Sequence, residues 1–151
     1  MQTLTFMMGN YPAELPTDYF YCRNHMWCQS RPDGQWRFGF STYAIRLMQD
    51  VYFLEWSVNE GDAIALKQLI GNIETSKAVS DLFSPLAGTM TAINQEVLKD
   101  PSLINVGNYD VGWLFDMAGD ASATMDVAAY MAYLEAGWEN TQRILKGQMG
   151  D

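Results

Sequence analysis

Short apolar runs separated by residues typical of turns make up residues 19 to 118, and this pattern indicates many short β-strands. Asp33 and Gly34 lie between two such runs, MWCQS and QWRFGFS. An Asp-Gly pair in this setting is a strong signal for a tight hairpin turn, because both residues tolerate a positive φ. The sequence therefore predicts a hairpin centred on Asp33 and Gly34.

Three later segments also have the pattern of strands: DVYFLEWSV (50–58), the two halves of AVSDLFSPLAGTMTAIN (78–94) and GWLFDMA (112–118). Turns are expected at residues 59–62 and 85–88. The composition of residues 63–74 also suits a helix. Gly71 and the strand-like residues that follow it favour a strand there.

Two short helices are predicted within the same region. Ser41 or Thr42 can cap a helix in STYAIRLM, where apolar residues recur at helical spacing. The segment QEVLKDPSLIN (95–105) predicts a helical turn that stops at Pro101, because the residue before a proline avoids the α region.

The C-terminal segment has apolar residues at intervals of three and four and predicts one long helix. Ser122 can cap this helix and Gly147 can end it, and packing across the end of a barrel is its expected role. The Pro and Tyr residues near the N-terminus suggest an arm laid against the domain. The predicted division is an arm, a main β domain and a helical extension: residues 1–18, 19–118 and 119–151.

Composition and charge narrow the classes of function. A chain of 151 residues with 48% hydrophobic content can bury one core without disulfide or metal support. A net charge of -9 repels phosphate backbones and anionic lipid, so neither nucleic acid nor a membrane surface is an expected partner. No signal peptide or transmembrane pattern is recognised, and a cytoplasmic location is expected.

The inventory of reactive side chains argues against catalysis and metal binding. The chain has one histidine and two cysteines, and the spacing of Cys22 and Cys28 fits neither a CxxC redox pair nor a zinc knuckle. The sequence contains no nucleophile elbow and no glycine-rich phosphate loop. We therefore expect a protein that is not an enzyme.

Lys77, in GNIETSKAVSDLFSP, is the main candidate for a chemical role. If Ile73 and Val79 lie in paired strands, Lys77 is at the hairpin tip with its amine in water. A lysine that acts as a base or forms a Schiff base is normally desolvated, whereas an exposed amine suits an enzyme that attaches a group to it. Glu74 and Asp81 give the tip an acidic character that such an enzyme could recognise. By spacing alone, an ordinary solvated turn lysine is the alternative.

Several motifs in order carry a family resemblance. ETSKAVSDLFSP resembles the lipoylation hairpin of glycine cleavage system H proteins, E-S-x-K-A-x-S-D-L-x-S-P, and NHMWC resembles their H-E-W stretch. FGFSTYAIRLMQDVYFLEWSVNEGD, SPLAGTMTAINQEVLKDPSLIN and GWLFDM follow three further blocks of the family with nearly fitting spacings. The resemblance covers about residues 19 to 118.

The resemblance implies a barrel-sandwich hybrid of two small antiparallel sheets, mainly β, with lipoate in amide linkage to Lys77. It further implies a carrier that serves a multi-enzyme system, loaded by a lipoate ligase or another lipoylating enzyme. Its other implied partners are dihydrolipoamide dehydrogenase and either the glycine cleavage enzymes or a heterodisulfide-reductase-like complex. An acidic carrier can be steered to basic patches on such enzymes.

Departures from the family pattern bear on the cargo. Met26 replaces the acid of H-E-W, Ser57 or a neighbour replaces a proline, and Met48, Gln49 and Asp50 replace Leu-Gly-Asp. With the cysteines and the long tail, these changes resemble the lipoate-binding proteins of sulfur oxidation more closely. Sulfur is therefore the expected cargo, with an aminomethyl group as the alternative, and an unmodified H-like scaffold or regulator as a further one.

Three residues are candidates for contact with the arm. His25 could hydrogen-bond to or protonate its thiols, because an unperturbed imidazole titrates near neutrality, or it could be a structural histidine. Cys22 and Cys28 could exchange with the lipoyl disulfide, or they could pack as small buried hydrophobes.

Overall fold

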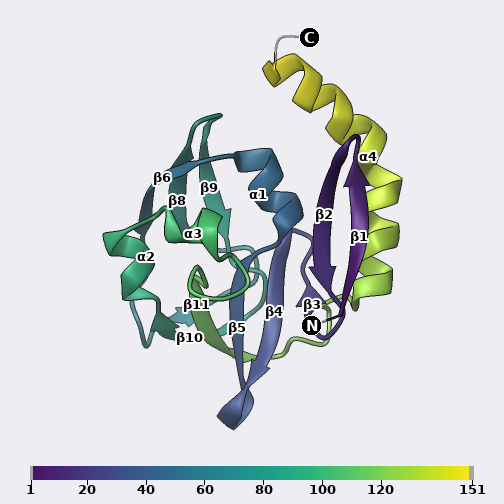
Figure 1. Cartoon of the computed structure of the whole chain (residues 1–151). Helices are drawn as coiled ribbons and strands as arrows, with labels where there is room; N and C mark the ends of the chain where they lie inside the picture. Colours follow the sequence, from purple (N-terminus) through teal and green to yellow (C-terminus); the bar gives the residue numbers. More distant parts are fainter. Residues whose placement is uncertain (1, 150–151) are drawn as a thin grey trace.

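Antiparallel sheets dominate the computed structural model, which describes residues 2–149 (Figure 1). The larger sheet has six strands in the order β3 (Phe20–Tyr21), β4 (Met26–Arg31), β5 (Gln35–Phe40), β11 (Phe115–Gly119), β10 (Gly88–Ile93) and β7 (Ala63–Ile64). The smaller sheet has three, in the order β6 (Val51–Trp56), β8 (Leu69–Thr75) and β9 (Val79–Phe83). The helices are α1 (Thr42–Met48), α2 (Gln95–Lys99), α3 (Leu103–Val106) and α4 (Val127–Met149), with a short 3₁₀ turn at Pro32–Gly34. The expected fold class, mainly β with short helices and a C-terminal helix, is confirmed.

Local sequence signals account for most of these elements. Asp33 and Gly34 have φ angles of 65° and 72°, and they join β4 to β5 as predicted. Ser41 caps α1, since its Oγ accepts a hydrogen bond from the backbone N–H of Ala44 at 3.3 Å. Residues 63–64 and 69–74 lie in strands β7 and β8, which a turn at residues 65–68 separates, so the prediction of strand over helix is confirmed for these two stretches.

Residues 3–16 form a hairpin of their own, in which β1 (Thr3–Met8) pairs with β2 (Tyr11–Pro16). Its inward side chains are buried: Phe6, Met8, Ala13 and Leu15. They pack with Tyr43 of α1 and with Tyr130 and Leu134 of α4 in one apolar cluster. The two ends of the chain therefore share a core, and Figure 1 shows β1 and β2 beside α4.

A second, larger cluster fills the space between the six-stranded and three-stranded sheets. Both sheets contribute to it, with Phe38, Met90 and Phe115 from the larger sheet and Ile70 and Ile73 from the smaller one. Phe38 and Phe115 stack with ring centroids 5.2 Å apart. This core supports β8 and β9, the strands that carry Lys77.

The predicted ends of the C-terminal helix are both wrong. The helix begins at Val127, after Asp126, whose carboxylate accepts a hydrogen bond from the backbone N–H of Ala129 at 2.8 Å. Ser122 lies outside it because Met125 forms a β-bridge with Tyr21, which keeps this segment extended. Gly147 lies within the helix, which continues to Met149. Within residues 2–149, every helix is too short or too polar to span a membrane.

Candidate functional site

The tip of the β8–β9 hairpin is held by hydrogen bonds of its own backbone and of Thr75. The Thr75 N–H donates to the Ala78 carbonyl at 2.9 Å, and Thr75 Oγ1 accepts from the backbone N–H groups of Lys77 and Ala78, both at 3.2 Å. The Ser76 N–H donates to the carbonyl of Asp50, just before β6, at 2.9 Å. These bonds fix the backbone around Lys77 without using its side chain.

The Lys77 side chain is exposed at this tip. Figure 1 shows that the connection between β8 and β9 projects beyond α1 and the neighbouring strands. Among the residues that the structure describes, no hydrogen bond or ion pair engages the Lys77 amine. An amine in this position is accessible to another enzyme and free to form an amide. Lys77 therefore fits the requirements of a lysine that carries a covalent group.

Glu74 and Asp81 lie on one outer face of the hairpin. Glu74 pairs with Val79 and Asp81 pairs with Asn72, and paired residues in antiparallel strands share a face. Both carboxylates are exposed, whereas Ile73, on the opposite face, is fully buried. The two acids thus flank the tip on the side away from the core.

His25 lies at the junction of β4, α1 and α4. Its Nδ1 is 2.9 Å from the hydroxyl of Tyr130, which in turn is 3.1 Å from Ser41 Oγ. Its ring centroid is 4.8 Å from that of Tyr43 and 5.8 Å from that of Tyr133. Burial lowers the pKa of His25 to about 4, so the imidazole is neutral at pH 7. A neutral imidazole here can exchange hydrogen bonds, but it brings no positive charge to the site.

The two cysteines face the core between the sheets. Cys28 is fully buried, and Cys22 is 6% exposed at the edge of a pocket of about 330 Å³. Burial raises the pKa of Cys22 to about 12, and burial followed by the neighbouring Cys22 raises the pKa of Cys28. Both thiols are therefore protonated at neutral pH, and a protonated thiol is a weak nucleophile.

The structure separates these residues from the surroundings of His25. Met26, 1% exposed, lies in the same inter-sheet cluster as Cys22 and Cys28. His25, with a φ of 70°, contacts the aromatic side chains of α1 and α4 instead. The methionine and cysteines expected around the histidine do not assemble a polarisable pocket with it.

Tyr130 is the partner of His25 that sequence reasoning missed. It is fully buried and follows His25 by 105 residues in the chain. A tyrosine on the buried face of a predicted helix was the available signal, because a buried phenol needs a hydrogen-bond partner. Among the described residues, no group of three or more His, Cys, Asp or Glu side chains is placed to bind a metal ion.

Comparisons with known proteins agree on one family. The family model of the glycine cleavage H-protein matches residues 19–136. A glycine cleavage system H protein of Mycobacterium bovis is 35% identical over 117 residues, which cover 78% of this chain and 84% of that protein. One from Psychrobacter cryohalolentis is 37% identical over 129 residues, covering 85% and 94%. The crystal structure of a glycine cleavage system H protein from Mycobacterium marinum superposes with a TM-score of 0.71 at 26% identity, covering 79% of this chain and 98% of that one.

Proposed function

Because the chain belongs to the glycine cleavage H-protein family, we propose that it is the H protein of a glycine cleavage system, with lipoate in amide linkage to Lys77 and an aminomethyl group as cargo. Proteins of this family are non-catalytic lipoyl carriers that serve a multi-enzyme system, and their lipoate is attached to a lysine. The proposal therefore concerns which lysine is modified, which cargo is carried and which enzymes take part.

The placement of Lys77 carries the proposal. Its amine is exposed at the end of a hairpin whose backbone is fixed by Thr75 and Asp50. When bound, lipoate supplies a disulfide or dithiol on a long flexible arm, which can present cargo to several active sites at high effective concentration. The chain's own task is to hold the anchoring amine outside the sheets. Glu74 and Asp81 offer a lipoylating enzyme two charges to recognise on one side of that amine.

Aminomethyl cargo is favoured over sulfur. The relatives named above are all glycine cleavage system H proteins. The case for sulfur depended on Met26, Cys22 and Cys28 near His25 and on the long C-terminal tail, but the side chains of the three residues lie in the inter-sheet core. The heterodisulfide-reductase-like partner has no other support. Glycine decarboxylase, dihydrolipoamide dehydrogenase and a lipoate ligase are the partners that follow from this proposal.

Reconstitution with glycine decarboxylase tests the cargo directly. The lipoylated protein should support exchange of labelled bicarbonate into glycine, and a Lys77→Arg variant passed through the same lipoylation reaction should not. A lipoylated protein that supports no exchange would overturn the aminomethyl cargo. Mass spectrometry of the native protein, purified without reductant, would then separate a sulfur adduct on Lys77 from an unmodified lysine.

A further inference from the structure

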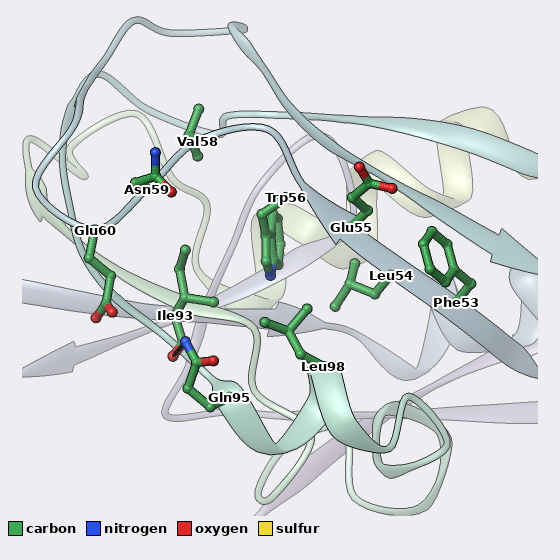
Figure 2. A pocket seen from close by; sticks show the side chains of 10 residues that line it. All are labelled: Phe53, Leu54, Glu55, Trp56, Val58, Asn59, Glu60, Ile93, Gln95 and Leu98. Carbon is green, nitrogen blue, oxygen red and sulfur yellow. Dashed lines mark hydrogen bonds between the residues drawn. The ribbon is translucent and has the colours of Figure 1, made fainter.

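A groove of about 460 Å³ runs between β6 and α2, on the three-stranded sheet that also carries Lys77 (Figure 2). Six of the ten residues that line it are apolar and four are polar. The residues that matter for its chemistry are Phe53, Glu55, Trp56, Glu60, Ile93 and Leu98. None of them takes part in the hydrogen bonds that hold the tip of the Lys77 hairpin.

Trp56 is an unusual element of this groove. Its ring packs edge to face on Phe115 of the core, with centroids 5.5 Å apart. Its Nε1 is buried and, alone among the buried side-chain nitrogens and oxygens that the structure describes, has no hydrogen-bond partner. In Figure 2 this nitrogen is at the end of the indole that faces α2. A buried donor without an acceptor is energetically unfavourable. A ligand that brought an acceptor to this nitrogen would therefore bind more tightly.

Exposed apolar side chains also line the groove. Phe53 is 43% exposed and Leu98 is 37% exposed, one on β6 and the other on α2. Such side chains in a concave site favour an apolar occupant, because its burial removes further apolar surface from water.

The charge around the groove selects among apolar occupants. Glu55 and Glu60 are exposed lining residues, and the whole chain has a net charge of -9. Lys99 of α2 adds no free positive charge, because its amine is 3.7 Å from the carboxylate of Glu96. An occupant that bears lysine or arginine is attracted to this surface and an acidic one is repelled.

The groove lies on the same sheet as the hairpin that carries Lys77, one strand length from its tip. Trp56 pairs with Gly71 at one end of the β6–β8 ladder, and Val51 pairs with Thr75 at the other end, next to the hairpin tip. The two ends are five residue steps apart along β6, a span of roughly 17 Å. A partner loop bound in the groove would therefore contact the same three-stranded sheet that carries the Lys77 arm.

We infer that the β6–α2 groove docks a basic, apolar loop of an enzyme that acts on the Lys77 arm, an inference that rests on the proposed carrier function. An aliphatic side chain of the loop enters between Phe53 and Leu98. A loop carbonyl accepts the hydrogen bond of Trp56 Nε1, and flanking lysine or arginine side chains pair with Glu55 and Glu60.

A peptide titration tests the groove without any assay of carrier function. Acetyl-Gly-Lys-Leu-Arg-Gly-amide is added to the ¹⁵N-labelled full chain, and the indole ¹⁵N–¹H resonance of Trp56 is followed. A saturable shift of this resonance is expected in the wild type and in Leu4→Glu. It should be lost in Leu98→Glu. Leu4 is 40% exposed and lies on β1, which Figure 1 shows on the other side of the molecule from β6 and α2, so Leu4→Glu is the matched control.

Carrier kinetics give a second readout. In the glycine decarboxylase exchange reaction, Leu98→Glu and Glu60→Lys should each raise the KM for the lipoylated carrier about tenfold with little change in kcat. Leu4→Glu and Glu135→Lys, which make the same changes elsewhere on the surface, should stay within about twofold of wild type. Glu60 is exposed, so Glu60→Lys keeps the test valid if Leu98→Glu does not fold.

The two readouts separate failure of the inference from failure of the proposed function. A groove-specific change in either the Trp56 resonance or the KM supports the inference. Peptide binding without exchange activity would remove the glycine cleavage assignment and leave the docking groove. Exchange activity with wild-type KM values in both groove variants, together with an unmoved Trp56 resonance, would overturn the groove and leave the assignment.

Discussion

His25 Nδ1 lies 2.9 Å from the hydroxyl of Tyr130, and this contact joins the start of β4 to the C-terminal helix. Ser41, the cap of α1, approaches the same hydroxyl at 3.1 Å. One phenol thus connects two elements of the first third of the chain to the C-terminal helix. The junction is buried among aromatic rings, so its stability depends on the imidazole staying neutral.

The stability of the protein should fall as the pH drops from about 6.5 to 4. Burial lowers the pKa of folded His25 to about 4, whereas the unfolded residue titrates near 6.5, so the unfolded state binds more protons in this window. Between pH 7.5 and pH 5 the free energy of unfolding should decrease by about 2 kcal/mol from this group. Urea unfolding at both pH values measures it. His25→Asn, which tolerates the positive φ at this position, should lack most of this pH dependence, and an equal loss in both proteins would contradict the assignment.

Tyr130→Phe should lower the free energy of unfolding by about 1–2 kcal/mol, because it leaves His25 Nδ1 and Ser41 Oγ without their shared partner. Tyr133→Phe is the control on the same helix. Its hydroxyl donates to the Arg23 carbonyl at 3.2 Å in an exposed position, so its loss should be worth less than about 0.5 kcal/mol. Equal effects of the two variants in urea denaturation would show that the buried junction has no special weight.

Arg37→Ala should be the more damaging of two arginine substitutions. Arg37 Nε and Nη2 donate to the two carboxylate oxygens of Asp116 at 2.9 and 3.1 Å, and Asp116 is only 6% exposed. The guanidinium also lies 3.7 Å from the ring centroid of Trp113. Its removal leaves a buried carboxylate unpaired and should lower the free energy of unfolding by about 3 kcal/mol.

Arg143→Ala breaks a pair of similar length, 2.9 Å to Glu139, but both side chains are more than 70% exposed. This control should change the free energy of unfolding by less than about 0.5 kcal/mol. Urea midpoints compared at a constant m-value measure both variants. The double variant Arg37→Met with Asp116→Leu should recover part of the loss. A double variant as unstable as Arg37→Ala would argue that packing, and not the unpaired charge, causes the effect.

Local signals in the sequence predicted what nearby residues determine. The turn at Asp33 and Gly34 and the Ser41 cap depend on residues within four positions of each other, and both are confirmed. The start of α4 depends on the bridge between Tyr21 and Met125, which are over 100 residues apart. The spacing of apolar residues along the helix could not predict such a long-range contact. The same limit explains the candidate site. The exposed tip at Lys77 follows from its own hairpin, whereas the partner of His25 comes from the far end of the chain.

Charge reversal at Glu74 or Asp81 should slow lipoylation and leave the fold intact. Both carboxylates are exposed on the outer face of the hairpin and make no ion pair among the described residues, so their replacement by lysine should change stability by less than about 0.5 kcal/mol. If a lipoate ligase recognises them, the initial rate of lipoylation should fall about tenfold. Asp18→Lys, at another exposed site in the turn between β2 and β3, serves as the control for net charge. Equal rates in all three variants would exclude recognition through these two acids.

Lys77→Arg should abolish lipoylation, while Lys67→Arg should have no effect on it. Both lysines are exposed and flank β8, with Lys67 in the turn before this strand and Lys77 after it, but only Lys77 is at the tip of the β8–β9 hairpin. Peptide mass spectrometry after incubation with lipoate, ATP and a lipoate ligase measures the modification at each position. Full labelling of Lys77→Arg would contradict the assignment of the attachment site.

A folding defect cannot account for the expected loss, because the hairpin turn is held by the backbone N–H of residue 77 and by Thr75, and the lysine side chain takes no part. Unchanged thermal unfolding of Lys77→Arg should therefore accompany its loss of labelling, and this combination would identify the residue as an attachment point and not as a structural support.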